Sequence, residues 1–440
     1  MKKIKDLINF QFSSIKTAIR YLESCKKKNI DITISPYCDF VTWADGLGFE
    51  NFLLLIKKKK INFKFLKFFF YESLLIRNNY ELINLNNNLD NYKKINVVYS
   101  YCSKENFDNK GVFSDKYFSE NNKKNKNTFW FLISLDNFVP KYGKNIFIIK
   151  RKKDYFGFFY NIKFIFSCLF KKNFFHICNK TSNFSKIIST HFYNTFKDKN
   201  FSLYLPFENR PHQNSIIKKA KFISNENKVY GYLHPMPWSF QLDMIYKNKS
   251  LDRLYVCSKI QKKVLIKYFQ WPLKKIKIVN SLRFNKLVKR NNYIFLPYEI
   301  QNKEEFYLNS IKKFFDLSLA STKNLKISIH PLKLKNLKHL RLKKKIFENV
   351  KFSNSNSVHK KNYPVILGAP GGVVAECLQT VGKAYHITDN VFDIFSSKMW
   401  NNIKTKKISS NLYEYTFLKN QNLIETNNKK NNFSRLLKQN

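Results

Sequence analysis

A glycine-rich turn, placed between an expected strand and an expected helix, is the part of this sequence best suited to hold an anion. Residues 368–387 read GAPGGVVAECLQTVGKAYHI, so Gly371 and Gly372 would lead into a helix that begins at Val373. Glycine lets backbone N–H groups come close to a ligand, and the first turn of a helix offers free donors and a positive dipole end. Glu376, one turn later, is expected to reach ribose hydroxyls. The alternative is an ordinary tight turn, since the run matches neither GxxxxGK[ST] nor GxGxxG.

A histidine closes a second expected strand. Residues 327–331 read ISIHP, and ligands of open parallel sheets bind beyond the carboxyl ends of strands. His330 is therefore a candidate to hydrogen-bond a nucleotide phosphate, while Pro331 holds the turn. We expect this imidazole and the glycine turn to meet in one pocket. Arg283 and Lys383 are candidates to neutralise the phosphate charge, with solvated surface positions as the alternative for each.

The first half of the chain offers candidates for a general base, which a transfer to a hydroxyl group requires. Glu208, in LPFENRPH, follows one expected strand and precedes His212. His234, in GYLHPMPW, ends the next expected strand and stands close to Trp238, whose ring could stack on a sugar. Each of these residues also has a structural alternative, as a capping carboxylate or a packed histidine.

These residues lie in a pattern of strands that alternate with helices. Residues 94–102 read as a strand, 252–269 as a strand and a helix capped by Ser258, and the pattern restarts after a polar linker at 285–292. The polar, Asn/Lys-rich stretch 104–126 is expected to be a surface loop. Such alternation predicts parallel, doubly wound sheets, and two such blocks predict α/β architecture with two Rossmann-type domains that face a cleft. The expected division is an acceptor domain at 1–285, a nucleotide-binding domain at 286–425 and a flexible tail at 426–440.

The order of the motifs resembles that of a known enzyme class. A His-Pro pair on one strand, followed by a small-residue loop that opens a helix, is similar to the CMP-sugar-binding half of bacterial GT-B sialyltransferases and related capsule transferases. In those families the histidine and a small hydroxyl pair contact the CMP phosphate. His330 and Pro331 match the first motif. Pro370, Gly371 and Gly372 stand in place of the hydroxyl pair, so backbone donors would take over its role.

Two further resemblances concern other parts of the chain. PFENRPHQNSIIKKAK, VYGYLHPMPWSF, DRLYVCS and KIKIVNSLRF look like segments of a bacterial surface-carbohydrate (O-antigen) biosynthesis family, over about residues 201–388. Asp45, in TWADG, is similar to the acidic-Gly motif that carries the base in sialyltransferases, although Ala44 replaces its first acidic residue. Asp45 is therefore a third candidate base.

The charge of the chain is strongly positive, with 80 Lys and Arg against 30 Asp and Glu, a formal net charge of +50. Such a charge attracts nucleic acid or anionic membranes. Lys, Asn, Ile and Phe are all abundant and all have A/T-rich codons, so a base-composition bias accounts for the excess. Since no RRM, KH or helix-turn-helix pattern is present, no nucleic-acid partner is expected.

Cysteine usage and hydropathy bear on the compartment. Seven scattered cysteines without a CxxC pair favour neither disulfides nor zinc, and no DxD stands at a strand end, so no metal is expected. The apolar stretch at 155–170 is interrupted by Lys163 and is shorter than the roughly 20 residues of a membrane span, and no signal peptide is recognised. A cytoplasmic protein is expected, with basic and aromatic side chains suited to peripheral association with the inner leaflet of the plasma membrane.

Together these features predict a metal-independent, Leloir-type glycosyltransferase without a cofactor. Its donor would be a nucleotide-sugar, CMP-activated by resemblance, and its acceptor a surface glycan or a lipid-linked glycan. The alternatives are a nucleotide-sugar epimerase or polyol-phosphate transferase on the same scaffold, and a basic nucleic-acid-binding protein.

Overall fold

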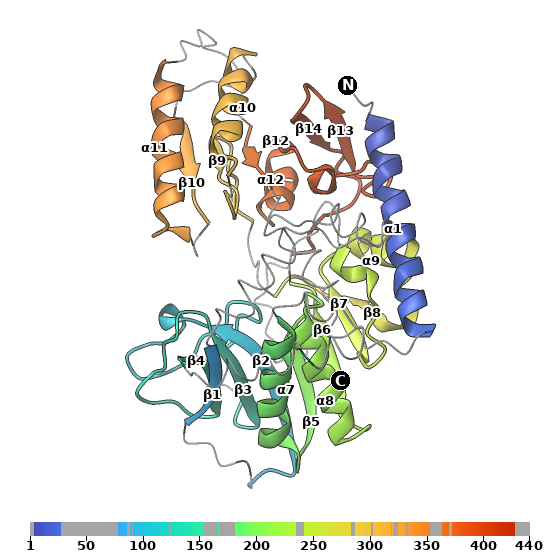
Figure 1. Cartoon of the computed structure of the whole chain (residues 1–440), viewed down its shortest axis with the longest axis vertical. Helices are drawn as coiled ribbons and strands as arrows, with labels where there is room; N and C mark the ends of the chain where they lie inside the picture. Colours follow the sequence, from blue (N-terminus) through green and yellow to red (C-terminus); the bar gives the residue numbers. More distant parts are fainter. Residues whose placement is uncertain are drawn as a thin grey trace.

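Two mixed β-sheets, one of eight strands and one of six, dominate the computed structural model of the chain (Figure 1). The structure describes residues 4–27, 78–85, 89, 91–123, 125–153, 166, 181–234, 242–282, 287–300, 302–317, 319, 324–330, 333–352, 363–368 and 372–426. Several predictions concern residues outside these ranges: those for Asp45, Trp238, Arg283, Pro331, Pro370, Gly371, most of the stretch 155–170 and all but the first residue of the tail 426–440. The architecture is α/β, and it is compatible with two Rossmann-like domains.

The larger sheet has the strand order β1-β4-β3-β2-β5-β6-β7-β8, and all its pairs are parallel except β1 with β4. The order of the strands along the chain reverses between β2 and β5. The chain continues from β2 to β3 on one side of this point and from β5 to β6 on the other. Its elements are β1 (Asn78–Leu85), β2 (Lys94–Cys102), η2 (Lys104–Asn106), β3 (Thr128–Ser134), β4 (Ile146–Lys153), α7 (Thr181–Phe196), β5 (Asn200–Pro206), α8 (Pro211–Ile223), β6 (Lys228–Tyr232), η3 (Leu242–Ile245), β7 (Arg253–Val256), α9 (Lys259–Lys267), η4 (Leu273–Lys275) and β8 (Ile276–Ile278).

The smaller sheet has the order β10-β9-β11-β12-β14-β13, in which the first four strands pair in parallel and β14 pairs antiparallel with both β12 and β13. Here the order reverses between β9 and β11. Its elements are β9 (Tyr293–Phe295), α10 (Glu304–Asp316), β10 (Lys326–Ser328), α11 (Leu337–Phe352), β11 (Val365–Leu367), α12 (Val373–Val381), β12 (Lys383–Ile387), η6 (Val391–Asp393), β13 (Ile403–Lys407) and β14 (Leu412–Phe417).

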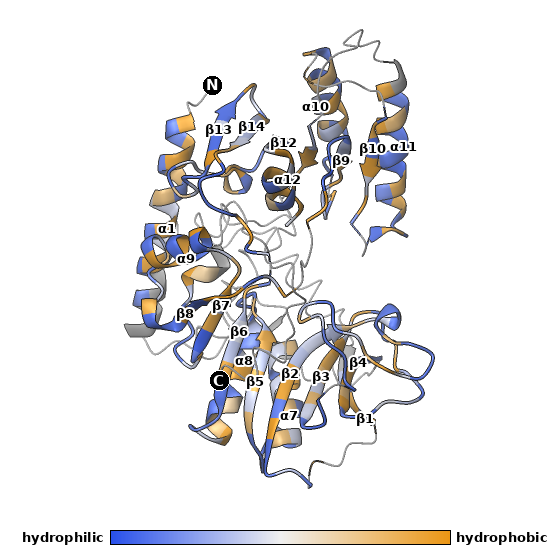
Figure 2. Ribbon diagram, turned by 180° about the vertical axis from the view of Figure 1, so that it is seen from behind, coloured by the Kyte–Doolittle hydropathy of each residue, from blue (hydrophilic) through white to orange (hydrophobic). Residues whose placement is uncertain are grey.

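Alternating side chains explain how the larger sheet is covered. Val97 and Tyr99 of β2 join the hydrophobic cluster that includes residues of α7, α8 and α9, whereas Val98 joins a second cluster on the opposite face. Since successive strand residues point to opposite faces, two apolar faces require a near-continuous apolar run, which β2 has. Orange, apolar segments lie both on strands of the larger sheet and on the helices packed against it (Figure 2).

Several local predictions are confirmed by the coordinates. The strand expected at 94–102 is β2, and Ser258 caps α9 by accepting a hydrogen bond from the Gln261 N–H. The expectation that the Asn/Lys-rich stretch 104–126 is merely a surface loop is wrong. Phe113 and Phe118 from this stretch are buried against the sheet at 0% and 1% exposure, because their rings fill the face that the described helices leave open.

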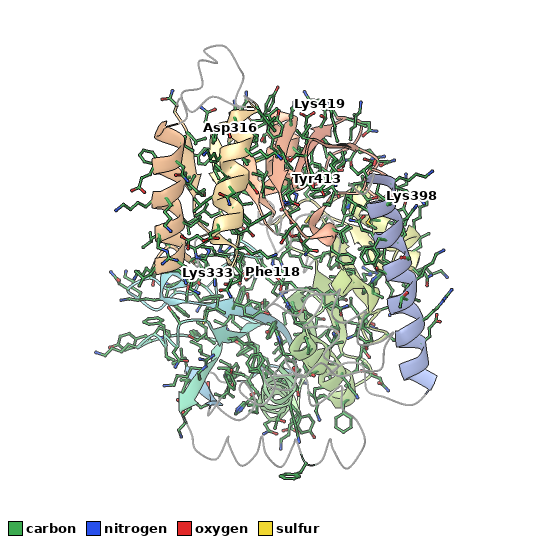
Figure 3. The ribbon with its side chains drawn as sticks, turned by 45° about the horizontal axis from the view of Figure 1, so that its top comes forward. Phe118, Asp316, Lys333, Lys398, Tyr413 and Lys419 are labelled. Carbon is green, nitrogen blue, oxygen red and sulfur yellow. The ribbon has the colours of Figure 1, made fainter. Side chains whose placement is uncertain are left out.

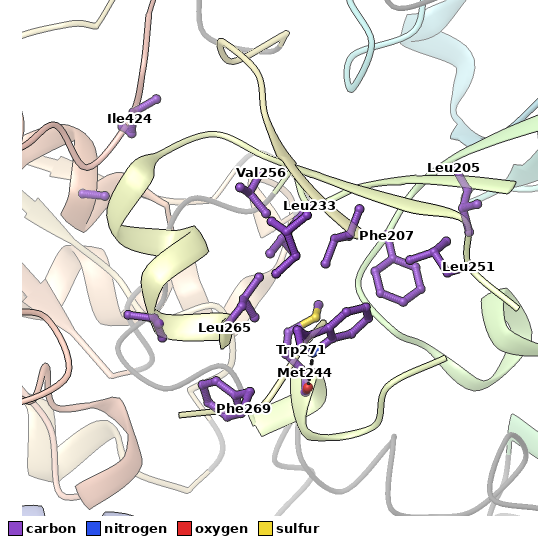
Figure 4. Close-up of a cluster of buried hydrophobic side chains, with 14 of the residues drawn as sticks. Leu205, Phe207, Leu233, Met244, Leu251, Val256, Leu265, Phe269, Trp271 and Ile424 are labelled. Carbon is purple, nitrogen blue, oxygen red and sulfur yellow. Dashed lines mark hydrogen bonds between the residues drawn. The ribbon is translucent and has the colours of Figure 1, made fainter. Parts of the chain in front are cut away.

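The two halves are joined by more than the linker before β9. The N-terminal helix α1 (Ile4–Lys27) runs along both (Figure 1), and the side-chain amide of its buried Gln11 donates to the carbonyls of Val391 and Ile394. Near the other end of the chain, the Glu425 N–H donates to the Cys257 carbonyl after β7 at 2.7 Å, and Ile424 lies at the margin of the hydrophobic cluster drawn in Figure 4. The last strand of the larger sheet ends at Ile278 and the first strand of the smaller sheet begins at Tyr293, and segments near both ends of the chain contact both halves.

Candidate functional site

The loop that follows β5 lies at the point where the strand order of the larger sheet reverses. Side-chain hydrogen bonds hold its backbone in place: the Gln213 carbonyl accepts from the N–H groups of Glu208 and Arg210 at 2.9 and 3.1 Å, and its amide donates to the Pro206 carbonyl. Asn209 adopts the left-handed conformation at φ 59°, and its amide donates to the Tyr246 carbonyl. A loop fixed in this way can present side chains in one geometry.

A carboxylate, an imidazole and a guanidinium meet in this loop. Glu208 accepts from Arg210 Nε at 3.1 Å through one oxygen and lies 3.1 Å from His234 Nε2 through the other. His234 follows β6, the neighbour of β5, so the contact results directly from strand pairing. A carboxylate only accepts, so Nε2 carries a hydrogen and, in the neutral ring, Nδ1 is the basic nitrogen.

The charges set the protonation state of the carboxylate. Desolvation alone would raise the pKa of Glu208, but the hydrogen bond from His234 and the charge of Arg210 together lower it well below its usual range. Glu208 is therefore ionised at neutral pH and is a weak base. Its geometry suits it to orient His234 and to stabilise the imidazolium when the ring takes up a proton.

A second histidine in the same loop has different surroundings. His212 Nε2 lies 2.9 Å from the Tyr101 hydroxyl, and Gln213 donates to that hydroxyl at 3.4 Å. Desolvation, with the charge of Arg210, lowers the pKa of His212 to about 3, so the ring is neutral at neutral pH. Removal from water raises the pKa of Tyr101 above its ordinary value, so the phenol is protonated at neutral pH.

An aromatic ring covers His234. The Tyr117 ring packs edge-on against the imidazole, with 4.4 Å between ring centroids and an interplanar angle of 74°. Asp115 fixes this arrangement, because its carboxylate accepts from the backbone N–H groups of Tyr117 and Phe118 at 2.7 and 2.6 Å and from the Ser100 hydroxyl of β2. The segment that the sequence suggested was a plain surface loop thus contributes to this site.

The carboxyl edge of the smaller sheet carries its own cluster of polar side chains. His330, after β10, packs edge-on against Tyr298, which follows β9, with 4.9 Å between ring centroids. Lys333 lies over the same Tyr298 ring, with its Nζ 4.6 Å from the centroid, and pairs with Glu299. Figure 3 shows Lys333 at the level where the two halves meet, as it does Phe118 of the larger sheet.

Several charges act on the Tyr298 hydroxyl. Desolvation raises its pKa most, and the neighbouring charges of Lys333 and Glu299 follow, in opposite directions. The charges of Arg210 and Glu208, after β5 of the larger sheet, have the smallest effects on this pKa, again in opposite directions.

The glycine turn lies on the same edge of the smaller sheet as His330. β9 separates β10 from β11, so about 10 Å of sheet lies between the two elements, at about 4.8 Å per strand. Gly368 is left-handed at φ 68°, and its carbonyl oxygen lies 2.6 Å from Nε2 of the buried His386. Gly372 is the N-cap of α12 and Val373 its first residue, as the sequence predicted.

Two residues predicted for the nucleotide site have other roles. Glu376 is buried, accepts from the Val288 N–H at 3.0 Å and lies 3.8 Å from Arg290 Nε, so its carboxylate fastens the linker before β9 to α12 instead of standing free for a ribose. Lys383 begins β12, at the edge opposite to the carboxyl ends, and pairs with Glu414 at 2.8 Å. The sequence around Glu376 does not show that the linker before β9 folds back onto α12.

The residues that the sequence did not single out are Tyr101, Tyr117, Arg210, Tyr298 and Lys333. Arg210 and Tyr298 each stand within four residues of a strand end, which is the same signal that identified Glu208 and His330. Tyr117 and Lys333 come from segments without such a signal. Their place in the site depends on tertiary contacts alone.

Comparisons with known proteins add no relative. No protein-family model matches the chain, and neither a curated protein nor a solved structure matches it either. Within the described ranges, no group of three or more His, Cys, Asp or Glu side chains is placed to hold a metal ion. Among the helices of those ranges, none has both the length and the apolar character that crossing a membrane requires.

Proposed function

We propose that the protein is a glycosyltransferase of the two-domain GT-B type that moves a sugar from a nucleotide donor to a hydroxyl of a glycan or lipid-linked acceptor. The observation that carries the proposal is the His234–Glu208–Arg210 cluster at the reversal point of the larger sheet, together with His330 and Tyr298 at the carboxyl edge of the smaller sheet. Such reversal points are where open α/β sheets bind ligands.

In the proposed reaction, His234 is the general base. The described residues enclose Nδ1, so the acceptor hydroxyl reaches it only when a neighbouring group such as the Tyr117 ring moves aside. Nδ1 then takes the proton of the acceptor hydroxyl as the oxygen forms a bond to the anomeric carbon, while the bond from that carbon to the donor phosphate breaks and its electron pair leaves with the nucleotide. Glu208 holds the imidazole in the required tautomer and stabilises its protonated form. This assignment favours His234 over Glu208 as the base, because the lowered pKa of Glu208 makes it a poor proton acceptor.

The leaving phosphate would lie at the edge of the smaller sheet. His330 and Lys333 supply donors and positive charge there, and the first turn of α12 supplies backbone N–H groups after Gly372. These groups could balance the charge of a phosphate without a metal. A CMP-activated donor is the specific form that the His-Pro resemblance implies.

The proposal is tested by thermal denaturation of the full chain with CMP, CDP, UDP, GDP and their sugars. A ligand at about a hundred times its dissociation constant stabilises the folded state by about 2.7 kcal/mol. We expect one nucleotide class to raise the melting temperature and His330→Ala to reduce that shift. Analysis of the products with the matching sugar nucleotide then separates transfer from epimerisation and from polyol-phosphate transfer.

The matched control is His191→Gln. His191 lies on α7, and its ring hydrogen-bonds the Tyr80 carbonyl of β1, the border strand of the larger sheet. This variant should keep the full nucleotide response. Absence of a shift with every nucleotide and sugar nucleotide, together with tight, salt-dependent binding of RNA or DNA, would replace the transferase proposal by the nucleic-acid alternative.

A further inference from the structure

One face of α11 is buried in the hydrophobic core of its half of the molecule. Leu342, Ile346 and Val350 are 0%, 0% and 6% exposed and join the hydrophobic cluster that contains Phe314 and Phe315 of α10. These positions recur every three or four residues, the spacing of one helical stripe. The apolar residues elsewhere on α11 are therefore not needed to hold the helix on the domain.

The opposite face of α11 is apolar as well. Leu337 is 80% exposed, Leu340 44% and Phe347 48%, and Leu334 just before the helix is 57% exposed. At 100° per residue, the three helical positions fall within an arc of about 80°. Of the thirteen large hydrophobic side chains exposed in the described ranges, four lie in this one segment. Soluble surfaces seldom gather apolar side chains in this way without a partner.

The same segment is strongly basic. Residues 333–352 contain eight Lys and Arg and one acidic residue, Glu348. Arg341 and Lys345 pair with Glu304 of α10, at 2.6 and 2.9 Å. Four further lysines of the segment are exposed: Lys335, Lys338, Lys343 and Lys344. In Figure 1, α11 forms the outer border of its half of the molecule, so this face is turned away from both sheets.

We infer that the outer face of α11 docks the protein on an anionic lipid bilayer. A helix that lies in a membrane interface combines a row of large apolar side chains with flanking lysines, which meet the acyl boundary and the headgroup phosphates respectively. A nucleic-acid duplex would use the lysines but would leave Leu337 and Leu340 without an apolar environment. The inference is independent of the chemistry at the two sheet edges.

The test is sedimentation of the full chain with vesicles of phosphatidylcholine alone and of phosphatidylcholine mixed with phosphatidylglycerol. We expect binding to the mixed vesicles only, weakening as salt is added. Each lysine near an anionic surface contributes about fivefold to partitioning, so removing three should weaken binding about a hundredfold. The charge variant is Lys338→Gln, Lys343→Gln and Lys344→Gln, and the apolar variant is Leu337→Gln, Leu340→Gln and Phe347→Gln.

Matched controls distinguish this helix from the general positive charge of the chain. One control removes three exposed lysines elsewhere and the other removes three scattered exposed apolar side chains. They are Lys274→Gln, Lys404→Gln and Lys406→Gln, and Phe222→Gln, Leu273→Gln and Leu418→Gln. Full binding by both controls, with loss in both α11 variants at unchanged melting temperature, supports the inference. Equal loss of vesicle binding in a control and in its α11 counterpart overturns it. Binding of RNA without binding of vesicles overturns it as well.

Discussion

Replacing Glu208 by glutamine removes the charge that Arg210 and His234 share while keeping the shape of the side chain. Glutamine has one acceptor oxygen, so one of the two donors, each now 3.1 Å from a carboxylate oxygen, must face an amide N–H group. The side chains of His234 and Arg210 are only 4% and 13% exposed. A buried donor that loses its acceptor costs about 1–3 kcal/mol, and more when it is charged. We therefore expect Glu208→Gln to lower the free energy of unfolding by about 2–3 kcal/mol at neutral pH.

The effect should depend on pH in a defined direction. The folded-state pKa of Glu208 is depressed, so its contribution to stability is fully present above the unfolded-state value of about 4.3 and is lost as the pH falls below that value. The glutamine variant lacks this contribution. The difference between wild type and variant should shrink by about 1.4 kcal/mol for each pH unit below about 4.3.

The assay is urea unfolding followed by tryptophan fluorescence at about pH 7, 5 and 3.5. Trp130 and Trp271 are buried in the larger-sheet half and report on its unfolding. Glu81→Gln is the control, because Glu81 pairs with Lys150 at 3.0 Å but both side chains are about one-third exposed, and such pairs contribute about 1 kcal/mol or less. A Glu208→Gln protein as stable as wild type at neutral pH, or a difference that persists unchanged in acid, would refute the reasoning.

Three further predictions concern the rest of the molecule. Gly368→Ala should lower the free energy of unfolding by about 2–4 kcal/mol in denaturant titrations, since the new Cβ would lie 2.7 Å from the Tyr307 hydroxyl in a left-handed backbone; Gly382→Ala, with nothing within 4 Å, should lose only about 1 kcal/mol, and equal losses would contradict the packing argument. Gln11→Ala should lower the free energy of unfolding by about 1–3 kcal/mol and make the two halves unfold in separate thermal transitions. A single, unshifted transition in calorimetry would show that α1 does not couple the two halves. Desolvation raises the pKa of Asp393 to about 7, so between about pH 3.9 and 7 the folded state binds a proton that the unfolded state has lost, and stability falls as pH rises. Asp393→Asn should flatten this pH dependence of stability, and parallel profiles of wild type and variant would contradict the prediction.

The correct fold predictions depended on local sequence patterns, as β2 illustrates. A continuous apolar run with β-branched and aromatic residues is what a strand buried on both faces requires, and Ser258 before an amphipathic run is what a helix start requires. Both features depend on neighbouring residues only. The wrong expectation for 104–126 has the complementary cause, because its many polar residues hide the buried carboxylate of Asp115 and the rings of Phe113 and Phe118.

The candidate site was visible in parts. Glu208, His234 and His330 were found because polar residues at the ends of parallel strands gather at one edge of a sheet. Their partners depend on which strands are neighbours: Glu208 meets His234 because β5 pairs with β6 in register. Glu376 was expected near a ribose because it lies one turn into the helix after the glycine turn, but its carboxylate accepts from the Val288 N–H, 88 residues away in sequence.

The central claim is that His234 removes a proton from the acceptor in a reaction whose donor is held at the smaller sheet. It is tested most directly by the turnover of His234→Ala with the sugar nucleotide that stabilises the wild type. We predict turnover reduced by about 10²–10⁴-fold, with the donor-induced rise in melting temperature preserved. Wild-type turnover in this variant would contradict the account.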